Sequence, residues 1–451
     1  MQAAEINKEF IAEIKNLISV DDRYQLKGVL HPFHEVDIAE IMDKVSMDEA
    51  KYIYLTLDSE IAAEVLLNID EDNRDVFLQT LSSKEIAKTI IENIESDDAA
   101  DVLSELEDDK KDEVISFIED KEVVDRIVEL MGYDEDSAGG LMGKEMVVVN
   151  VNWSVAYSIR SMKRQAENVE NIFSVYVIDD NDLLLGTLSL RKLLFSTSSA
   201  KDKIGDIFIS EDMISVTPEV DAEEVATIMQ KYDLVVLPVL ENDKLIGRIT
   251  FDDVMDVMQE EAEKDYQMIS GLTEEVDSTD SVWGHTRARL PWLLIGMLGG
   301  LASAQVIGLF DIESNVRMAM FIPLVMAMGG NVGVQSSSII VQGLANGSFK
   351  DLSIGSSLVK ELGVGLVNGF ICSVLVFGIC FLFKIGMSLA ITVSVALFTV
   401  IVMSAIFGTL IPLTLNKFKI DPAVATGPFI TTTNDIFGIF VYFIIGQWLM
   451  V

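Results

Sequence analysis

Five long apolar stretches in the last third of the chain limit its fold more than any other feature. Each contains about the 20 apolar residues that an α-helix needs to cross a bilayer. We place them at Leu290–Phe310, Val316–Leu344, Val359–Phe383, Ala390–Leu415 and Pro422–Val451. The chain is therefore expected to be a multi-pass membrane protein with a domain of five transmembrane helices.

The charges of the chain divide at nearly the same place. Residues 1–280 contain 66 acidic and 25 basic residues, a net charge of −41, whereas the remainder contains 6 acidic and 8 basic residues. An acidic field of that size repels phosphate backbones and concentrates cations around it. We therefore expect mobile cations as natural ligands and no nucleic-acid partner.

Basic residues in the apolar part indicate its direction in the cell membrane. Most of them lie on the side shared with the acidic part, namely Arg287, Arg289, Lys350, Lys360, Lys417 and Lys419, and only Arg317 and Lys384 lie on the other side. Because positively charged loops stay in the cytoplasm, the N-terminus is expected there and the C-terminus outside. Residues 1–10 carry no basic region followed by an apolar run, so we expect no cleaved signal peptide.

A short helical phrase repeats in the acidic part. It occurs at Asp37–Met42, Glu60–Leu66 and Glu85–Ile91, with a degenerate copy at Asp98–Leu103. The first residues of the three clear copies are 23 and 25 positions apart, which is the span of one helix pair. This periodicity is typical of stacked helical hairpins and predicts a small superhelical N-domain at residues 1–135.

After residue 139 the pattern changes to short β-rich runs that alternate with helical ones. Each half of this region ends with a buried strand, an acidic turn and a strand that finishes Gly-x-x-hydroxyl, as in Gly186–Ser189 and Gly247–Thr250. The predicted strands are Met146–Val149, Ser174–Ile178, Leu183–Leu188, Ile214–Val216, Leu234–Val239 and Leu245–Thr250. This duplication resembles a tandem pair of CBS domains, which we assign to residues 136–258 as an α/β module.

An acidic run follows and is expected to form one long helix from Phe251 to about Trp283. Its portion at residues 259–284 links the CBS pair to the transmembrane domain at residues 285–451. The predicted fold is thus multidomain, with a superhelical N-domain, tandem CBS domains, a linking helix and five membrane helices.

One carboxylate, Asp435, lies in the middle of an apolar crossing. Such a charge costs about 2.5–3.5 kcal/mol on insertion scales and is normally retained for a function. It follows a run of threonines and Asn434, and Pro428 is expected to disturb the helix and free nearby carbonyls. Carboxylate, hydroxyl and carbonyl oxygens are all ligands for hard cations.

The second crossing carries a matching polar stretch. Gly329, Gly330 and Gly333 lack side chains, so backbone carbonyls can face a pore, while Asn331 and Gln335 point amides along one face. Close packing of small residues is the alternative for the glycines. The amides favour a pore, and neutral oxygens with one carboxylate suit a hydrated Mg²⁺ ion.

These features together resemble the MgtE family of Mg²⁺ channels. The most specific matches are the stretches Gly329–Gln335 and Gly427–Asp435, and the resemblance covers nearly the whole chain. It implies a homodimer with a pore between the second and fifth helices of both protomers. It also implies a central Mg²⁺ site at Asp435 and the backbone carbonyl of Thr431.

The resemblance further implies that cytosolic Mg²⁺ closes the channel. Carboxylates crowd the end of the second CBS unit and the linking helix, and Mg²⁺ that bridges them would draw the domains together. The candidate regulatory ligands are Asp252, Asp253, Asp256, Glu260, Glu261, Asp265 and, at the mouth of the fifth crossing, Asp421. A solvated acidic face is the alternative for each of them.

The second CBS half also carries a nucleotide signature. Gly-x-x-Thr/Ser-x-x-Asp, which holds a ribose in many CBS pairs, fits Gly247, Thr250 and Asp253, whereas the first half has Lys192 in place of the aspartate. ATP is therefore a candidate regulator that would bind at most one half.

No catalytic constellation is present in the sequence, so we predict that the chain is not an enzyme. Two other functions share this architecture. A transporter of Co²⁺ or Mn²⁺ would use similar oxygen ligands, although no His, Cys or Met lies beside Asp435. A membrane-anchored adenylate sensor would not need five crossings with an intramembrane carboxylate.

Overall fold

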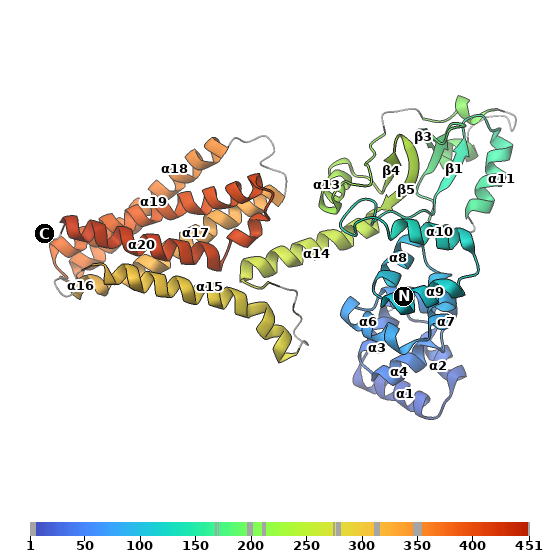
Figure 1. The fold of residues 1–451 in the computed structure, drawn as a ribbon, viewed down its shortest axis with the longest axis horizontal. Helices are drawn as coiled ribbons and strands as arrows, with labels where there is room; N and C mark the ends of the chain where they lie inside the picture. The colour runs from blue at the N-terminus through green and yellow to red at the C-terminus, as the bar shows by residue number, and fades with distance from the viewer. Residues whose placement is uncertain are drawn as a thin grey trace. The chain divides into compact units, whose positions relative to one another are not determined.

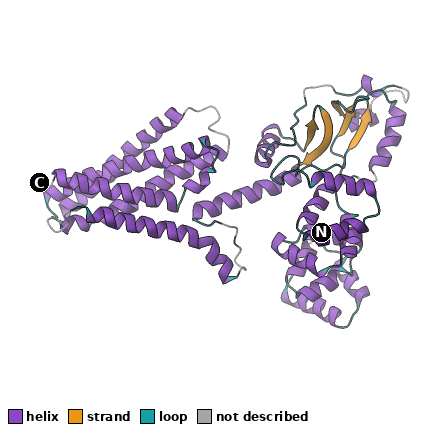
Figure 2. Cartoon of the chain, in the orientation of Figure 1, coloured by secondary structure: helices purple, strands orange, loops and turns teal. Residues whose placement is uncertain are grey.

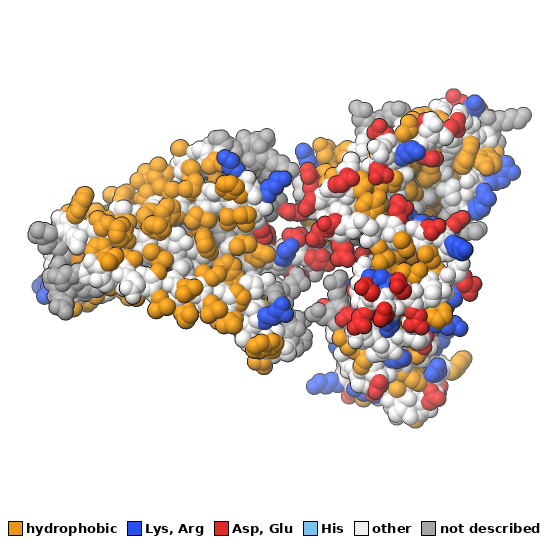
Figure 3. All heavy atoms as spheres, in the orientation of Figure 1, with side chains coloured by type: hydrophobic (Ala, Val, Ile, Leu, Met, Phe, Trp, Pro, Cys, Tyr) orange, Lys and Arg blue, Asp and Glu red, His pale blue; other side chains and the backbone are white. Residues whose placement is uncertain are grey.

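A computed structural model gives the fold of the chain (Figures 1 and 2). It describes residues 6–166, 169, 171–195, 202–209, 213–273, 276, 281–310, 316–345 and 354–449. The chain divides into two compact units, Met1–Met258 and Gln259–Val451. Acidic side chains gather on the first unit, whereas the surface of the second is largely hydrophobic (Figure 3).

The first unit begins with the predicted helical N-domain. Its helices are α1 (Lys8–Ser19), α2 (Arg23–Leu30), α3 (Glu35–Asp43), α4 (Met47–Tyr54), α5 (Ser59–Leu67), α6 (Glu71–Thr80), α7 (Ser83–Glu85), the π-helix η1 (Ile86–Ile91), α8 (Ser96–Ser104), α9 (Asp108–Phe117) and α10 (Lys121–Leu130). The three clear copies of the repeated phrase fall on α3, on α5 and on α7 with η1, which pack against one another. The predicted stacking of helical hairpins is therefore confirmed, while the degenerate copy falls on α8.

The CBS pair contains two small sheets. The first half has β1 (Val147–Asn150), α11 (Val155–Gln165), β2 (Val175–Ile178), β3 (Leu184–Leu188), α12 (Leu190–Phe195) and the 3-10 helix η3 (Ile204–Asp206), and the second has α13 (Ala222–Tyr232), β4 (Val236–Glu241) and β5 (Lys244–Thr250). β1 pairs parallel with β2, which pairs antiparallel with β3, and β4 and β5 form an antiparallel pair. Five of the six predicted strands form. The sixth, Ile214–Val216, is reduced to a single parallel bridge between Val216 and Val239.

The cores of the two CBS halves differ in what they pack against. The first half has its own cluster around Val149, Val175 and Val177. In contrast, buried residues of the second half, such as Leu237 and Ile249, belong to the same apolar cluster as the N-domain. The N-domain and the second CBS half therefore share one hydrophobic core, which fixes their mutual position and brings α8 close to β5.

The linking helix is shorter than predicted. α14 (Phe251–Ser270) ends where Gly271 adopts a φ of +81°, and the amide of Leu272 donates to the carbonyl of Gln267. This is the glycine C-cap that commonly terminates helices. The next helix begins only at Val282, so the expectation of one continuous helix to Trp283 is wrong.

Five helices of the second unit are long and apolar enough to cross a membrane, among the described residues. The helices are α15 (Val282–Gly308), the short α16 (Val316–Ala319), α17 (Ile322–Ala345), α18 (Ile354–Leu382), α19 (Met387–Lys417), the 3-10 helix η5 (Pro422–Ala425) and α20 (Pro428–Leu449). The second predicted crossing is thus broken between α16 and α17, and the fifth begins at Pro428. Lys350, used above to orient the chain, lies outside the described residues.

The packing of α17 against α20 depends on Gly333. A Cβ at that position would lie inside van der Waals contact with Nδ2 of Asn434 and 2.7 Å from Cγ2 of Ile430. Asn434 is only 1% exposed, and neither polar atom of its amide has a hydrogen-bond partner among the described residues. The amide of Asn434 therefore fills the space that glycine leaves.

We predict that Gly333→Ala separates α17 from α20 and destabilises the second unit by about 1–3 kcal/mol, the usual range for overpacking. Thermal unfolding of the detergent-solubilised protein measures this effect. Gly378→Ala on α18 is the matched control, because nothing lies within 4 Å of its Cβ position. An unfolding temperature of Gly333→Ala equal to that of the control would contradict the close contact.

Candidate cation sites

Asp435 lies at the start of the third turn of α20, and the start of this helix differs from the expectation. Pro428 is the first residue of α20, where its missing amide proton is not needed, so it does not interrupt a helix. The carbonyl of Gly427 accepts the amide of Thr431 at 3.1 Å, and the Thr431 hydroxyl donates to the carbonyls of Gly427 and Pro428 at 3.2 and 3.0 Å. The predicted release of carbonyls by Pro428 inside the helix is therefore wrong.

The structure brings several of the predicted pore residues together on α17 and α20. Gly330 faces Thr431, whose Cγ2 lies 3.5 Å from the Cβ position of the glycine. Gly329 and Gly330 are both buried in contacts between helices, which agrees with the alternative that these glycines allow close packing. Asn331, in contrast, is exposed on one face of α17. Asp435 is half-buried. Cation binding by these five residues stays a prediction.

The end of α14 contacts the start of the helix that carries Asp435. Gly427 adopts a φ of +57°, and a Cβ there would lie 2.6 Å from the carbonyl oxygen of Ile269. The Cβ position of Gly271 lies 2.9 Å from Cγ of Pro428. In addition, the amide and hydroxyl of Thr273 both donate to the carbonyl of Ala288 on α15, each at 3.1 Å. The end of the linking helix is therefore seated on two membrane helices of its own unit.

Two predicted regulatory residues of the second unit, Asp265 and Asp421, interact electrostatically. Burial raises the pKa of Asp265 on α14, and the negative charge of Asp421 raises it further. Asp421 also caps η5, because its carboxylate accepts the amide of Ala423 at 2.8 Å. A cation between these two carboxylates would replace repulsion by attraction and hold α14 against the start of α20.

A second group of carboxylates lies where α8 meets the CBS pair, and we call it the docking cluster. It consists of Glu95, Asp97, Asp98, Glu145 and Asp253. Oxygen atoms of Glu95, Asp97 and Glu145 lie within 4.8 Å of one another, a spacing that could hold a metal ion. Asp97 packs against the backbone of Gly143, with Oδ2 2.9 Å from the Cβ position of that glycine, and its Oδ1 is buried without a hydrogen-bond partner among the described residues.

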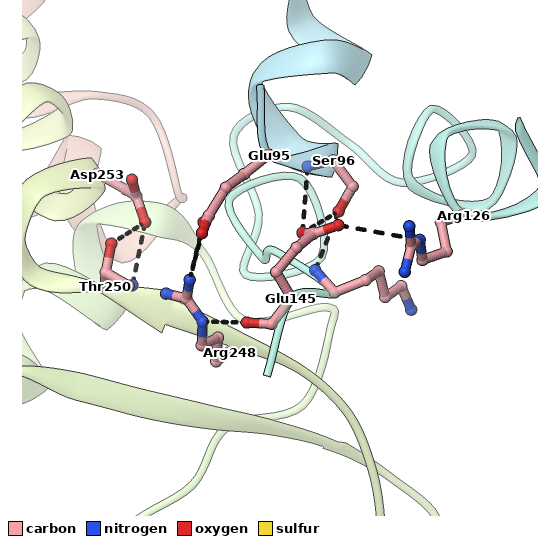
Figure 4. A network of polar contacts seen from close by, with 8 residues as sticks. Glu95, Ser96, Arg126, Glu145, Arg248, Thr250 and Asp253 are labelled. Carbon is pink, nitrogen blue, oxygen red and sulfur yellow. Dashed lines mark hydrogen bonds and ion pairs between the residues drawn. The ribbon is translucent and has the colours of Figure 1, made fainter. Parts of the chain in front are cut away.

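Protein cations satisfy part of the docking cluster (Figure 4). Arg248 on β5 donates twice to Glu95, at 2.9 and 2.8 Å, and also to the backbone carbonyl of Glu145. The Glu145 carboxylate accepts the amide and hydroxyl of Ser96 at 3.1 and 2.7 Å, and Arg126 lies 3.8 Å away. These bonds leave Asp97, Asp98 and Asp253 as the carboxylates that Arg248 and Arg126 do not pair with directly.

The electrostatics of these three carboxylates favour cation binding. Burial is the largest cause of a raised pKa in each, and it raises the pKa of Asp98 to about 8, with a further contribution from the charge of Asp253. The pKa of Asp97 is raised well above its usual range by burial and then by Asp98. In Asp253, hydrogen bonds from Thr250 oppose the effect of burial on the pKa. Because the ionised forms are disfavoured, a divalent cation would release energy by neutralising them.

The predicted regulatory residues therefore do not form one site. Asp252 and Asp265 lie 13 positions apart on α14, which is about 20 Å of helix and more than one ion can bridge. Asp253 joins the docking cluster, and Asp265 interacts electrostatically with Asp421. Asp252, Asp256 and Glu260 are exposed, and Glu261 pairs with Lys264 at 2.9 Å. The sequence reasoning missed Glu95, Asp97, Asp98 and Glu145. Its only signal was the acidic start of the degenerate repeat at Asp98.

The candidate nucleotide residues are also engaged within the protein. Both the amide and the hydroxyl of Thr250 donate to Oδ2 of Asp253, the amide at 3.0 Å (Figure 4). Asp253 belongs to both the nucleotide signature and the docking cluster.

Together, the acidic clusters of the first unit and the apolar helices of the second define a multi-pass membrane protein for cation transport with attached regulatory domains. Family models agree along the chain: a divalent cation transporter model matches residues 322–445, an MgtE intracellular N domain model matches residues 33–136, and a CBS domain model matches residues 138–198 and 204–260. The magnesium transporter MgtE of Bacillus subtilis is 33% identical to this chain over 317 residues, which is 70% of each chain. The magnesium transporter MgtE of Enterococcus faecalis is 33% identical over 324 residues, which is 71% of each chain. The chain belongs to the MgtE family.

Solved structures support the same assignment for the first unit. The soluble part of a magnesium transporter is 28% identical, with a TM-score of 0.50, and covers 56% of this chain and 99% of its own. The cytosolic domain of the Mg²⁺ channel MgtE in complex with ATP is 31% identical, with a TM-score of 0.51, and covers 55% and 99%. The predicted resemblance and fold class are therefore confirmed, and the curated relatives are transporters.

We predict that, above pH 8, where Asp98 ionises, replacing Asp97 and Asp98 together by asparagine raises the unfolding temperature in the presence of a chelator, because like-charge repulsion at the docking cluster disappears. The rise should be a few degrees, as expected for about 1 kcal/mol in a unit of this size. The further rise that Mg²⁺ produces in the wild type should shrink. Calorimetry of the full chain measures both effects.

The matched control is Asp109→Asn with Asp112→Asn, two exposed carboxylates of α9. It removes the same charge at a distance from the docking cluster. An equal response of both double variants would show that only the net charge matters.

Proposed function

We propose that this chain is an Mg²⁺ transporter of the cell membrane whose ion pathway runs along α17 and α20, and that cytosolic Mg²⁺ closes it. The observation that carries the proposal is the contact of the linking helix with the start of α20. It joins a helix with regulatory carboxylates to the helix with the intramembrane Asp435. Family membership supports Mg²⁺ as the cargo.

The pathway requires oxygen ligands for a hydrated dication. Asp435 supplies the fixed negative charge, and the Thr431 carbonyl, one turn earlier, supplies a neutral oxygen. Asn331, on the exposed face of α17, adds an amide, while Gly329 and Gly330 allow α17 to approach α19 and α20. An exposed polar face on α17 also suits a homodimer whose two copies share the pathway.

Closure follows from carboxylates that repel one another without a cation. Mg²⁺ bound at Asp97, Asp98 and Asp253 would stabilise the docked N-domain, and Mg²⁺ between Asp265 and Asp421 would hold α14 against α20. A ligand shifts a conformational equilibrium only through its different affinities for the two states. The closed arrangement brings the carboxylates together, so it binds Mg²⁺ more tightly.

Further parts of the proposal concern orientation and regulation. The basic residues Arg287, Arg289, Lys360, Lys417 and Lys419 favour a cytoplasmic N-terminus and an external C-terminus. ATP is proposed to bind at Thr250 and Asp253, consistent with the ATP complex of the related cytosolic domain. Transport of Co²⁺ or Mn²⁺ and a purely sensory role are not favoured, because the curated relatives are magnesium transporters.

Asp435→Ala is expected to abolish Mg²⁺ uptake into proteoliposomes, because no other fixed charge on α20 compensates a dication in the membrane. Asp435→Glu, which keeps the charge, should retain part of the activity. Both variants must elute as the same folded oligomer as the wild type. Wild-type uptake by Asp435→Ala would refute the assigned pathway.

Neutralising Asp253, Asp256 and Glu261 together should leave conduction intact and raise the Mg²⁺ concentration needed for closure. The physical reason is that the docking cluster loses Asp253, while the loss of Asp256 and Glu261 weakens the negative field of α14 that attracts cations. Currents in planar bilayers, recorded while Mg²⁺ on the cytosolic side is varied, measure this change. Closure at the wild-type concentration would mean that these carboxylates form only a solvated face.

A further inference from the structure

Glu361 is a carboxylate within the membrane helix α18 that the sequence analysis did not assign to any role. The hydroxyl of Ser336 on α17 donates to its Oε1 at 2.6 Å. A short hydrogen bond to a carboxylate is of the stronger, charge-assisted kind. α18 packs mainly along α19, and this hydrogen bond connects it directly to α17 as well.

Ser336 is also fixed from the side of α19. It is 3% exposed, and a Cβ at Gly408 of α19 would lie 2.9 Å from the Cβ of Ser336. The Cβ position of Gly408 also lies against the backbone carbonyl of Gly333 on α17. Ser336 is thus enclosed by the backbone of α19 and held by Glu361, so its direction around the axis of α17 is set by two helices.

The direction of Ser336 determines where the amides of α17 point. Asn331, Gln335 and Ile339 are exposed and follow one another at four-residue intervals, so they share one face. Ser336 follows Gln335 directly and is therefore turned by about 100° around a helix with 3.6 residues per turn. Rotation of α17 would move the buried hydroxyl and the exposed amide face together.

We infer that Glu361 is a positioning residue for Mg²⁺ conduction, which acts through Ser336 to hold the amide face of α17 toward the ion. This inference rests on the proposed pathway along α17 and α20. Glu361 does not touch the ion in this role. It fixes the rotation of α17, and the neighbouring, amide-bearing face of that helix supplies the neutral oxygens.

Four variants test the inference in proteoliposomes, with initial Mg²⁺ uptake measured against Mg²⁺ concentration. Glu361→Ala and Ser336→Ala should each raise the KM for Mg²⁺ by about three-fold, the effect of a typical hydrogen bond between membrane helices. The double variant should raise it no further, because both single changes remove the same bond. Glu361→Gln should behave like the wild type, since its side-chain carbonyl still accepts the Ser336 hydroxyl.

Ser394→Ala is the matched control, because among the described residues that buried hydroxyl donates only to the carbonyl of Ala390 in its own helix, at 2.8 Å. Thermal unfolding in detergent, recorded for every variant, separates folding from positioning. A loss of stability with an unchanged KM would overturn the inference, as would additive effects in the double variant or a Glu361→Gln variant that matches Glu361→Ala.

Asp435→Ala, assayed in parallel, separates this inference from the proposed pathway. Loss of uptake in Asp435→Ala with a wild-type KM in Glu361→Ala would leave the pathway intact and refute only the role of Glu361. Normal uptake by Asp435→Ala would refute the pathway itself.

Discussion

Carboxylates repel one another where the N-domain packs against the second CBS half, and the proposed regulation follows from this repulsion. The shared hydrophobic core of the N-domain and the second CBS half places α8 against β5, so the negative charges of Asp97, Asp98 and Asp253 act on one another in this arrangement. Apolar burial favours this contact and electrostatics opposes it. Such an arrangement is sensitive to any ligand that removes the repulsion, and divalent cations do so most effectively because each neutralises two charges.

Arg248 limits how far that repulsion reaches. Its guanidinium pairs with the carboxylate of Glu95 and donates a hydrogen bond to the backbone carbonyl of Glu145. Arg248 itself is only 5% exposed. Without a fixed cation there, all five carboxylates of the docking cluster would need a mobile one. The protein thus divides the cluster into a part neutralised by its own guanidinium and a part that depends on the solution. Within the docking cluster, Asp97, Asp98 and Asp253 are then the carboxylates left for a cation from solution, as the proposed regulation requires.

In the membrane unit the corresponding constraint is close approach of helices. Gly333 admits the Asn434 amide, Gly427 admits the carbonyl of Ile269, and Gly408 admits the carbonyl of Gly333. Association within a bilayer relies on packing and hydrogen bonds rather than on the hydrophobic effect, so small residues at contacts contribute directly to stability. The same contacts align the polar residues of α17 and α20 and seat the end of α14 on the start of α20, which connects packing to transport.

Local periodicity was enough to predict the membrane crossings, the helical repeats and five of the six CBS strands, and the cost of a charge in lipid singled out Asp435 as a candidate ligand. The end of α14 and the effect of Pro428 were predicted wrongly. For Pro428 the reason is that the residue type does not reveal whether a proline begins a helix or lies inside it. Tertiary structure alone decided that the carboxylates of α14 separate into different sites, that Asp97 and Glu145 lie side by side although 48 residues apart, and that Glu361 holds Ser336. Those contacts join distant segments through a shared core, and no local pattern records them.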